Sequence, residues 1–217
     1  MKKVLYLHGL ESKQGGPKVD FLAKEFCVYA PEMDYKDPML QNWVDFVMRQ
    51  FQPDLIIGSS MGGYVADILA QKYGVPAILF NPAVHNRSFD PTIEPLIEGE
   101  QADLQKKKIV VLGKDDEVIP PYLTKLMFEN NRYYEIVLEE MAHQTPLNIF
   151  IDTINKYKNE QLIDHYQNQQ LYSLNLGGVI LHQLLMNPFV LRVIYLQLGI
   201  FLNQSSFLYL LINCSRI

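Results

Sequence analysis

The pentapeptide Gly58-Ser59-Ser60-Met61-Gly62 places a reactive hydroxyl among small residues at a spacing that serves nucleophilic chemistry. It matches the pattern G-x-S-x-G in one register, with Ser60 in the centre. A serine attacks a carbonyl carbon only if its Oγ stands clear of the backbone on a sharp turn. Such a turn brings the neighbouring chain so close that the residues two before and two after have no room for side chains. The pattern therefore predicts Ser60 as a nucleophile.

The segments on either side of the motif support this prediction. An apolar run at 55–57 is typical of a buried strand, and apolar residues at helical spacing follow the motif from Met61 to Leu69. A helix that begins at Met61 points its backbone N–H groups at the charge that develops on a carbonyl oxygen under attack. The Met61 N–H is one predicted oxyanion donor. A plain Gly/Ser-rich turn is the alternative interpretation.

A nucleophilic serine needs a base, and the base needs an acid that orients it. When the serine lies on a strand-to-helix turn, the expected chain order is serine, acid, histidine. Four of the five histidines do not fit: His8 and His85 precede any suitable acid, and His165 and His182 lie in a C-terminal region of different composition. His143, directly after the last predicted strand, is the predicted base.

The acid is expected just after the strand at 108–113. That position holds three consecutive acids, Asp115, Asp116 and Glu117. A run of three acids is typical of a solvated turn, so at most one of them is expected to be catalytic. The residues alone leave the choice open, with Asp116 and Asp115 as the main candidates.

A second oxyanion donor is expected in the loop after a strand that neighbours the strand of the nucleophile. The loop that follows the first predicted strand turns at His8-Gly9, and the next backbone N–H belongs to Leu10. Leu10 is therefore the predicted partner of Met61 in the oxyanion hole. An ordinary turn at the end of a strand is the alternative.

Short apolar runs alternate with helix-period segments through about Tyr157, which predicts right-handed crossovers and a parallel sheet with helices on both faces. Six strands are expected, in the segments KVLYLHG, CVYAPE, DLIIGS, PAILFNPA, KIVVLG and YYEIVLEE. Asp37-Pro38 and Thr145-Pro146 are predicted helix starts, since the first residue of each pair can accept backbone N–H bonds and proline suits the first helical position.

Two regions depart from this alternation. Residues 83–107 have scattered acids and no clean period, which predicts either a loop that covers the site or a surface loop with one short helix. From His165 to the end there is no acidic residue, and 193–215 is uncharged and long enough to span a bilayer, although polar residues at 203–206 interrupt it. A domain at 1–160 and an extension at 161–217 are therefore predicted. The extension is interpreted as a packed helical appendage, a membrane anchor or aberrant sequence.

The composition argues against some classes of function and some cellular locations. The net charge of −5 gives no reason to expect a nucleic-acid partner. Cys27 and Cys214 lie far apart, which disfavours a disulfide framework and fits a reducing compartment. The apolar start lacks a signal cleavage site, so a cytoplasmic location is expected. Since metal-binding and phosphate-loop motifs are missing from the sequence, no cofactor is expected.

Four segments together, LYLHGLESKQGGPK, DLIIGSSMGGYVADILAQKYGVPAILFNPAV, VVLGKDDEVIP and MAHQTP, resemble the small bacterial YqiA/YcfP-type esterases of the α/β-hydrolase superfamily. The resemblance covers about residues 2–157. It implies a three-layer α/β-hydrolase fold with a reduced, mostly parallel sheet of about six strands. In that family the acid comes three residues after a strand-end glycine, which selects Asp116. Nothing in the resemblance accounts for residues 165–217.

These observations predict a bacterial serine esterase that cleaves carboxylic esters through an acyl-enzyme, with Ser60, Asp116 and His143 as the triad. A thioesterase or acyltransferase with the same triad is the nearest alternative. A binding protein of the same fold without catalysis is the alternative from another class. The expected partner is a small ester or thioester, with membrane association only through the C-terminal extension.

Overall fold

A computed structural model of the chain describes residues 1–10, 12–94, 106–159, 172–176 and 179–183. The chain divides into two units, Met1–Ile163 and Asp164–Ile217. In the second unit the described residues form an antiparallel pair, β7 (Tyr172–Leu176) with β8 (Val179–Gln183). The predicted extension lies mostly outside the described residues, so its interpretation stays a prediction. The first unit contains all of the predicted catalytic residues.

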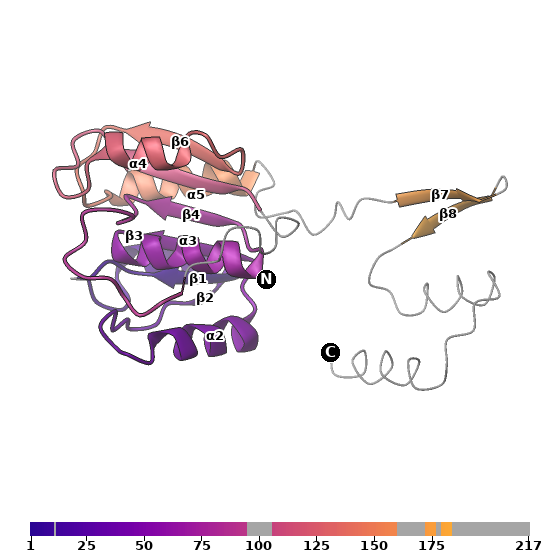
Figure 1. The fold of residues 1–217 in the computed structure, drawn as a ribbon, viewed down its shortest axis with the longest axis horizontal. Helices are drawn as coiled ribbons and strands as arrows, with labels where there is room; N and C mark the ends of the chain where they lie inside the picture. Colours follow the sequence, from indigo (N-terminus) through magenta and orange to yellow (C-terminus); the bar gives the residue numbers. More distant parts are fainter. Residues whose placement is uncertain (11, 95–105, 160–171, 177–178, 184–217) are drawn as a thin grey trace. The chain divides into compact units, whose positions relative to one another are not determined.

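A six-stranded sheet forms the centre of this unit, and all of its strand pairs are parallel (Figure 1). The strand order is β2-β1-β3-β4-β5-β6. The strands are β1 (Lys3–Leu7), β2 (Cys27–Tyr29), β3 (Leu55–Ser59), β4 (Ala77–Phe80), β5 (Lys108–Gly113) and β6 (Tyr134–Glu139). Each lies within one of the segments predicted as strands, and the predicted fold class is confirmed.

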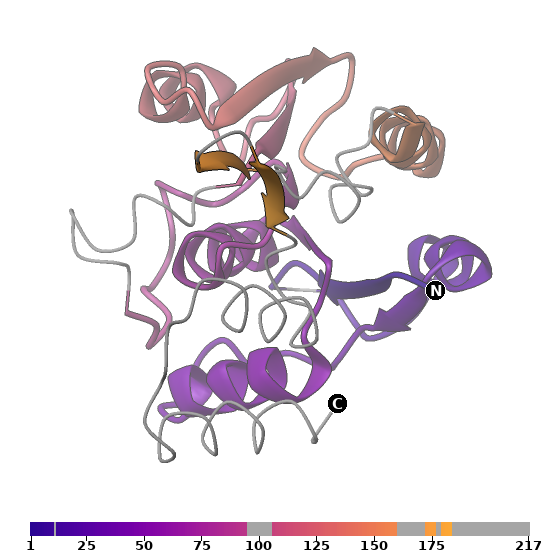
Figure 2. The same cartoon turned by 90° about the vertical axis from the view of Figure 1, so that its right-hand side faces the viewer.

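Helices cover both faces of the sheet. They are α1 (Pro17–Glu25), α2 (Leu40–Phe51), α3 (Met61–Tyr73), α4 (Pro121–Phe128) and α5 (Leu147–Asn159). In Figure 2 the indigo helix α1 and the orange helix α5 lie on one side of the sheet, and α2 and α3 lie on the other. Alternate side chains of each strand therefore enter two separate cores. In β1, Leu5 and Leu7 pack with α2 and α3, whereas Val4 and Tyr6 pack with α1 and α5.

The two predicted helix starts are displaced by a short turn or lack the expected cap. α2 begins at Leu40, because Asp37 first closes a local turn in which its Oδ1 accepts the Met39 N–H at 2.8 Å. α5 begins at Leu147, and the buried Thr145 Oγ1 has no hydrogen-bond partner among the described residues. The predicted helix start at Thr145-Pro146 is therefore confirmed, whereas the expected cap by the Thr145 hydroxyl was wrong.

The described part of the excursion, residues 83–94, contains bends and no helix, and 95–105 lie outside the described residues. Two of its contacts are with Ser60 and α3. Ala83 N–H donates to the Ser60 carbonyl at 2.9 Å, and the Arg87 guanidinium lies 4.0 Å from the centre of the Tyr64 ring on α3. Among the described helices none combines the length and the hydropathy needed to cross a bilayer. The segment 193–215, predicted as one alternative to be an anchor, is not among them.

Candidate active site

The predicted catalytic residues follow three strands of one parallel sheet. Ser60 comes directly after β3, Asp116 lies in the loop after β5, and His143 lies in the loop after β6. Parallel strands end at a common edge of the sheet, and β3, β4, β5 and β6 are successive neighbours. The topology thus brings residues that are far apart in sequence to one edge.

The three side chains form a continuous hydrogen-bonded chain. His143 Nε2 lies 2.9 Å from Ser60 Oγ, and His143 Nδ1 lies 2.8 Å from Asp116 Oδ2. A carboxylate only accepts hydrogen bonds, so the imidazole donates from Nδ1 and is left with Nε2 as an acceptor for the Ser60 hydroxyl. This is the arrangement in which an imidazole can remove the proton of a serine. The acid that the structure brings to His143 is Asp116, one of the two candidates.

Ser60 has a backbone conformation that non-glycine residues rarely adopt, with φ 54° and ψ −119°. Its N–H donates to the Phe80 carbonyl at 2.9 Å, and its own carbonyl accepts from Tyr64 at 3.1 Å and Ala83 at 2.9 Å. These bonds to β4, to the first turn of α3 and to the following loop hold the strained residue in place. The Ser60 side chain thereby stands at the point where β3 turns into α3.

The glycines that flank Ser60 sit where side chains do not fit, as the sequence predicts. A Cβ at Gly62 would meet the carbonyl oxygens of Leu7 and His8, and a Cβ at Gly58 would meet the Gly62 carbonyl and lie 2.7 Å from Ala66 Cβ. These obstacles are mostly backbone atoms, which cannot rotate away. The beginning of α3 therefore packs directly against the end of β1.

Asp116 is fixed by its own loop. Its Oδ1 accepts the N–H groups of Val118 at 2.9 Å and Ile119 at 2.8 Å, which leaves Oδ2 for His143. The Asp116 side chain is 1% exposed and the His143 side chain is 22% exposed. A reactant can therefore approach the predicted base from solvent, whereas the predicted acid contacts the imidazole and not the solvent.

The two predicted oxyanion donors lie on the two segments that meet at Ser60. Met61 is the first residue of α3, and Leu10 follows Gly9, whose Cβ position would lie 3.4 Å from Ser60 Cβ. Neither N–H is hydrogen-bonded to a described residue. Both are available to a substrate oxygen, so their role as an oxyanion hole stays a prediction that the local packing favours.

His8 has a structural role that the sequence analysis did not predict. It is 4% exposed, its Nδ1 donates to the Gly9 carbonyl at 2.8 Å, and its Nε2 accepts the Met33 N–H at 3.1 Å. This pair of contacts requires the neutral ring protonated at Nδ1. His8 thereby shapes the loop that carries Leu10. Sequence reasoning treated His8-Gly9 only as a turn, because Met33 is too distant along the chain for spacing to reveal the contact.

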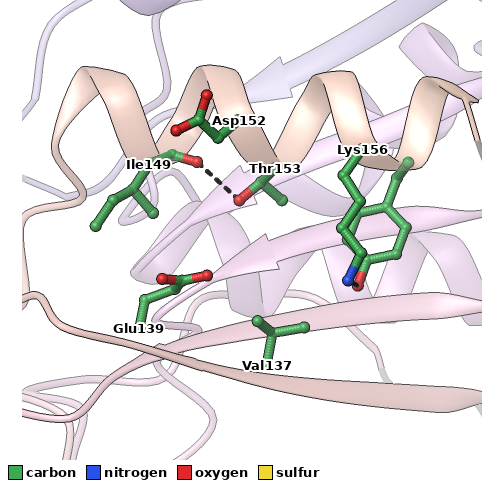
Figure 3. A pocket seen from close by; sticks show the side chains of 7 residues that line it. Val137, Glu139, Ile149, Asp152, Thr153 and Lys156 are labelled. Atoms are coloured by element: carbon green, nitrogen blue, oxygen red, sulfur yellow. Dashed lines mark hydrogen bonds between the residues drawn. The ribbon is translucent and has the colours of Figure 1, made fainter.

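A hollow of about 170 Å³ lies elsewhere, between β6 and α5 (Figure 3). Glu139, Asp152 and Lys156 supply its charged lining, and Thr153 Oγ1 donates to the Ile149 carbonyl at 2.8 Å along α5. None of the predicted catalytic residues lines it. Among the described residues no cluster of three or more His, Cys, Asp or Glu side chains could hold a metal ion.

Comparison with known sequences matches residues 3–95 to the family described as Uncharacterised protein family (UPF0227). A UPF0227 protein of Vibrio parahaemolyticus is 23% identical, over 63% of this chain and 87% of its own length. The chain resembles the UPF0227 family. UPF0227 is the YcfP/YqiA-like family, so the resemblance predicted from the sequence is confirmed. The matched residues include Ser60 and both predicted oxyanion donors, whereas Asp116 and His143 lie beyond residue 95.

Solved structures with a similar fold include hydrolases. An esterase of Thermogutta terrifontis superposes with a TM-score of 0.57 at 15% identity, over 74% of this chain and 90% of its own. A putative hydrolase of the α/β superfamily from Xanthomonas campestris gives 0.52 at 17% identity, over 72% of this chain and 99% of its own. Identities this low show the fold alone. The first unit has the α/β-hydrolase fold.

Proposed function

We propose that this protein is a serine hydrolase that cleaves carboxylic esters. The observation that carries the proposal is the hydrogen-bonded chain from Ser60 Oγ through the His143 imidazole to Asp116, at 2.9 and 2.8 Å. The strained backbone of Ser60 and the side-chain-free positions around it support a nucleophile rather than a passive turn. The α/β-hydrolase fold is compatible with this activity and does not by itself establish it.

In the proposed reaction Ser60 Oγ attacks the acyl carbon while His143 Nε2 removes its proton. The carbonyl oxygen becomes negatively charged, and the N–H groups of Leu10 and Met61 stabilise that charge. The protonated imidazole then donates its proton to the leaving alcohol as the ester bond breaks. The products of this half-reaction are the alcohol and an acyl group on Ser60.

Water completes the reaction by the same route. His143 removes a proton from the water that attacks the acyl-enzyme, and returns it to Ser60 Oγ as the carboxylic acid leaves. Asp116 accepts the Nδ1–H throughout and stabilises the positive form of the ring. No step requires a metal or an organic cofactor. The substrate is a small ester, and a cytoplasmic location remains an expectation from the cysteine content.

The direct test is hydrolysis of p-nitrophenyl esters from acetate to long acyl chains by the full-length chain. We expect turnover by the wild-type protein and a loss of about 10³-fold or more in Ser60→Ala, because the attacking atom is gone. Circular dichroism of both proteins verifies that the variant is folded. Equal rates in the two proteins would refute the proposal. Thioesters of the same acyl groups, and added alcohols as acceptors, distinguish an esterase from a thioesterase or an acyltransferase.

A further inference from the structure

Asn81 lies between the segments that carry the acid and the base. It is the first residue after β4, the strand that separates β3 from β5 in the sheet, and it begins the Asn-Pro-Ala sequence that contributed to the family resemblance. The proposed reaction assigns Asn81 no role. Asn81 is 1% exposed, so every polar atom of its side-chain amide needs a hydrogen-bond partner inside the protein.

The side-chain amide reaches both catalytic segments. Nδ2 donates to the carbonyl oxygens of Ala142 at 3.1 Å and His143 at 2.9 Å, and Oδ1 accepts the Gly113 N–H at 2.7 Å. Two carbonyls on one side and an N–H on the other fix the orientation of the amide. The backbone N–H of Asn81 donates to the Val111 carbonyl at 2.9 Å. Asn81 thus connects the end of β5 with the loop of the base.

These contacts act on the catalytic residues through short lengths of chain. The carbonyl that Asn81 holds belongs to His143 itself, and Gly113 begins the turn in which Asp116 N–H bonds back to the Gly113 carbonyl at 3.3 Å. Movement of either segment would change the distance from the imidazole to Ser60 Oγ or to Asp116 Oδ2. Displacement of a catalytic group by about 1 Å lowers the rate about 100-fold.

Few other residues fit this position. Asn81 has φ 43°, in the left-handed region that asparagine tolerates better than most residues. An aspartate would keep the acceptor for Gly113 but would direct an oxygen instead of an NH₂ group at two carbonyls. A glutamine would be one methylene too long for the enclosed space. The position therefore requires both the two donors and the acceptor of a short amide.

We propose that Asn81 is a positioning residue, whose amide sets the placement of His143 relative to Ser60 and Asp116. The inference rests on the proposed hydrolase function, since it concerns the same site. It assigns to Asn81 no contact with substrate. Its consequence is that loss of the two donated hydrogen bonds lowers kcat and leaves substrate binding nearly unchanged.

The experiment compares three full-length variants with the wild type at a temperature where all are folded. Asn81→Asp keeps size, acceptor and tolerance of positive φ, and removes the donors. Asn81→Gly keeps the backbone conformation and removes the whole side chain. Ile154→Val is the control, because Ile154 is fully buried in the core beneath α5 and its apolar side chain makes none of the hydrogen bonds of the site.

With p-nitrophenyl esters, we expect kcat to fall about 100-fold in Asn81→Asp and Asn81→Gly, with KM within about twofold of the wild type. In Ile154→Val the melting temperature falls and kcat is unchanged. A kcat close to wild type in a folded Asn81→Asp or Asn81→Gly protein would overturn the inference. So would a loss of kcat in Ile154→Val in proportion to the loss of stability.

A second readout separates this inference from the function on which it rests. The proton on His143 Nδ1, bonded to Asp116, is observed by proton NMR without turnover. We expect its resonance to shift or disappear in Asn81→Asp and Asn81→Gly and to persist in Ile154→Val. If the wild type hydrolyses no ester and the resonance still responds in this way, the proposed function fails and the positioning role of Asn81 stands. An unchanged resonance in both Asn81 variants would overturn that role.

Discussion

Two of the polar clusters that join an aspartate to a hydroxyl group differ in arrangement, and the arrangement proposed for catalysis occurs in the first of them. At the site, the His143 imidazole stands between Asp116 and the Ser60 hydroxyl. In a second cluster, called here the buried cluster, Tyr134 Oη donates directly to Asp67 Oδ1 at 2.7 Å. Gln71 Nε2 donates to Asp67 Oδ2 at 3.0 Å, and Lys108 Nζ lies 4.7 Å from the centre of the Tyr134 ring.

The buried cluster stabilises a particular packing and exposes nothing reactive. Burial raises the pKa of Asp67 to about 6, and the Tyr134 hydrogen bond and the charge of Lys108 oppose that rise. Burial and the adjacent Asp67 charge raise the pKa of Tyr134, so its hydroxyl keeps its proton. The comparison shows that an acid beside a hydroxyl is not a catalytic pair. The hydroxyl becomes a nucleophile where a base separates the two groups and a strained turn brings the oxygen within reach of solvent.

The largest difference in kcat is expected when aspartate is replaced by asparagine in each of the two clusters. In Asp116→Asn the amide can no longer hold the Nδ1–H tautomer of His143, and we expect kcat for ester hydrolysis to fall about 10⁴-fold. In Asp67→Asn, which removes none of the hydrogen bonds of the site, we expect kcat within about twofold of the wild type. Initial rates with p-nitrophenyl acetate measure both. Comparable losses in the two variants would mean that the comparison between the clusters is mistaken.

A smaller loss of activity is expected from Gly62→Ala. The added Cβ would meet the carbonyl oxygens of Leu7 and His8, so α3 must move away from the end of β1. This movement displaces the Met61 N–H from the Leu10 N–H, and we expect kcat to fall about 100-fold. Measurements of kcat and of the melting temperature on the same preparation of Gly62→Ala test this prediction. A variant with unaltered kcat and melting temperature would show that the tight packing is not needed.

The buried cluster should be visible in the pH dependence of stability. A carboxyl whose pKa rises from 3.8 to about 6 on folding binds more protons in the folded than in the unfolded state over that interval. The contribution of Asp67 protonation to the free energy of unfolding is therefore complete below the unfolded pKa of 3.8. This contribution is lost as the pH rises through the folded pKa of about 6. Relative to Asp67→Asn, the wild-type free energy of unfolding should fall by about 3 kcal/mol between pH 3 and pH 8. Urea unfolding across this range measures the difference, and parallel profiles would disprove it.

The smallest effect is expected from Tyr134→Phe. The substitution removes the donor to Asp67 and leaves the stacking of residue 134 on Phe128, whose ring centres are 4.5 Å apart. Because the lost bond involves a charged acceptor, we expect the free energy of unfolding at pH 7 to fall by about 2 kcal/mol with little change in kcat. Urea unfolding and ester hydrolysis test the two halves of this prediction. A larger effect on kcat than on stability would contradict a purely structural role.

The strands and the sharp turn at Ser60 could be predicted because local patterns specify them. Strands buried on both faces read as continuous apolar runs, and the sharp turn at Ser60 requires small neighbours whatever the rest of the fold does. The choice of Asp116 over Asp115 came from the family resemblance, and the geometry now places the Asp116 carboxylate against His143. Spacing alone does not tell which of two adjacent acids turns inward.

The residues that sequence analysis missed act through contacts between distant parts of the chain. His8 accepts from Met33 across the sheet edge, and Asn81 bonds to the loop of His143. Both are polar residues in turns, and polar residues are common in turns for local reasons, so the sequence pattern gives no sign of the distant contact. The Thr145-Pro146 pair correctly marked the start of α5, but the Thr145 hydroxyl makes no capping bond, and a sequence pattern does not show whether a hydroxyl reaches the N–H groups of the helix.

The central claim, that Ser60 is the nucleophile, is tested most directly by covalent labelling with a fluorophosphonate followed by peptide mass spectrometry. The adjacent Ser59 gives a matched control, since Ser59→Ala and Ser60→Ala remove the same atom one residue apart. We predict one adduct per chain on Ser60 in the wild type and in Ser59→Ala, and none in Ser60→Ala. Labelling that persists in Ser60→Ala, or a folded wild-type protein that does not react, would contradict the account.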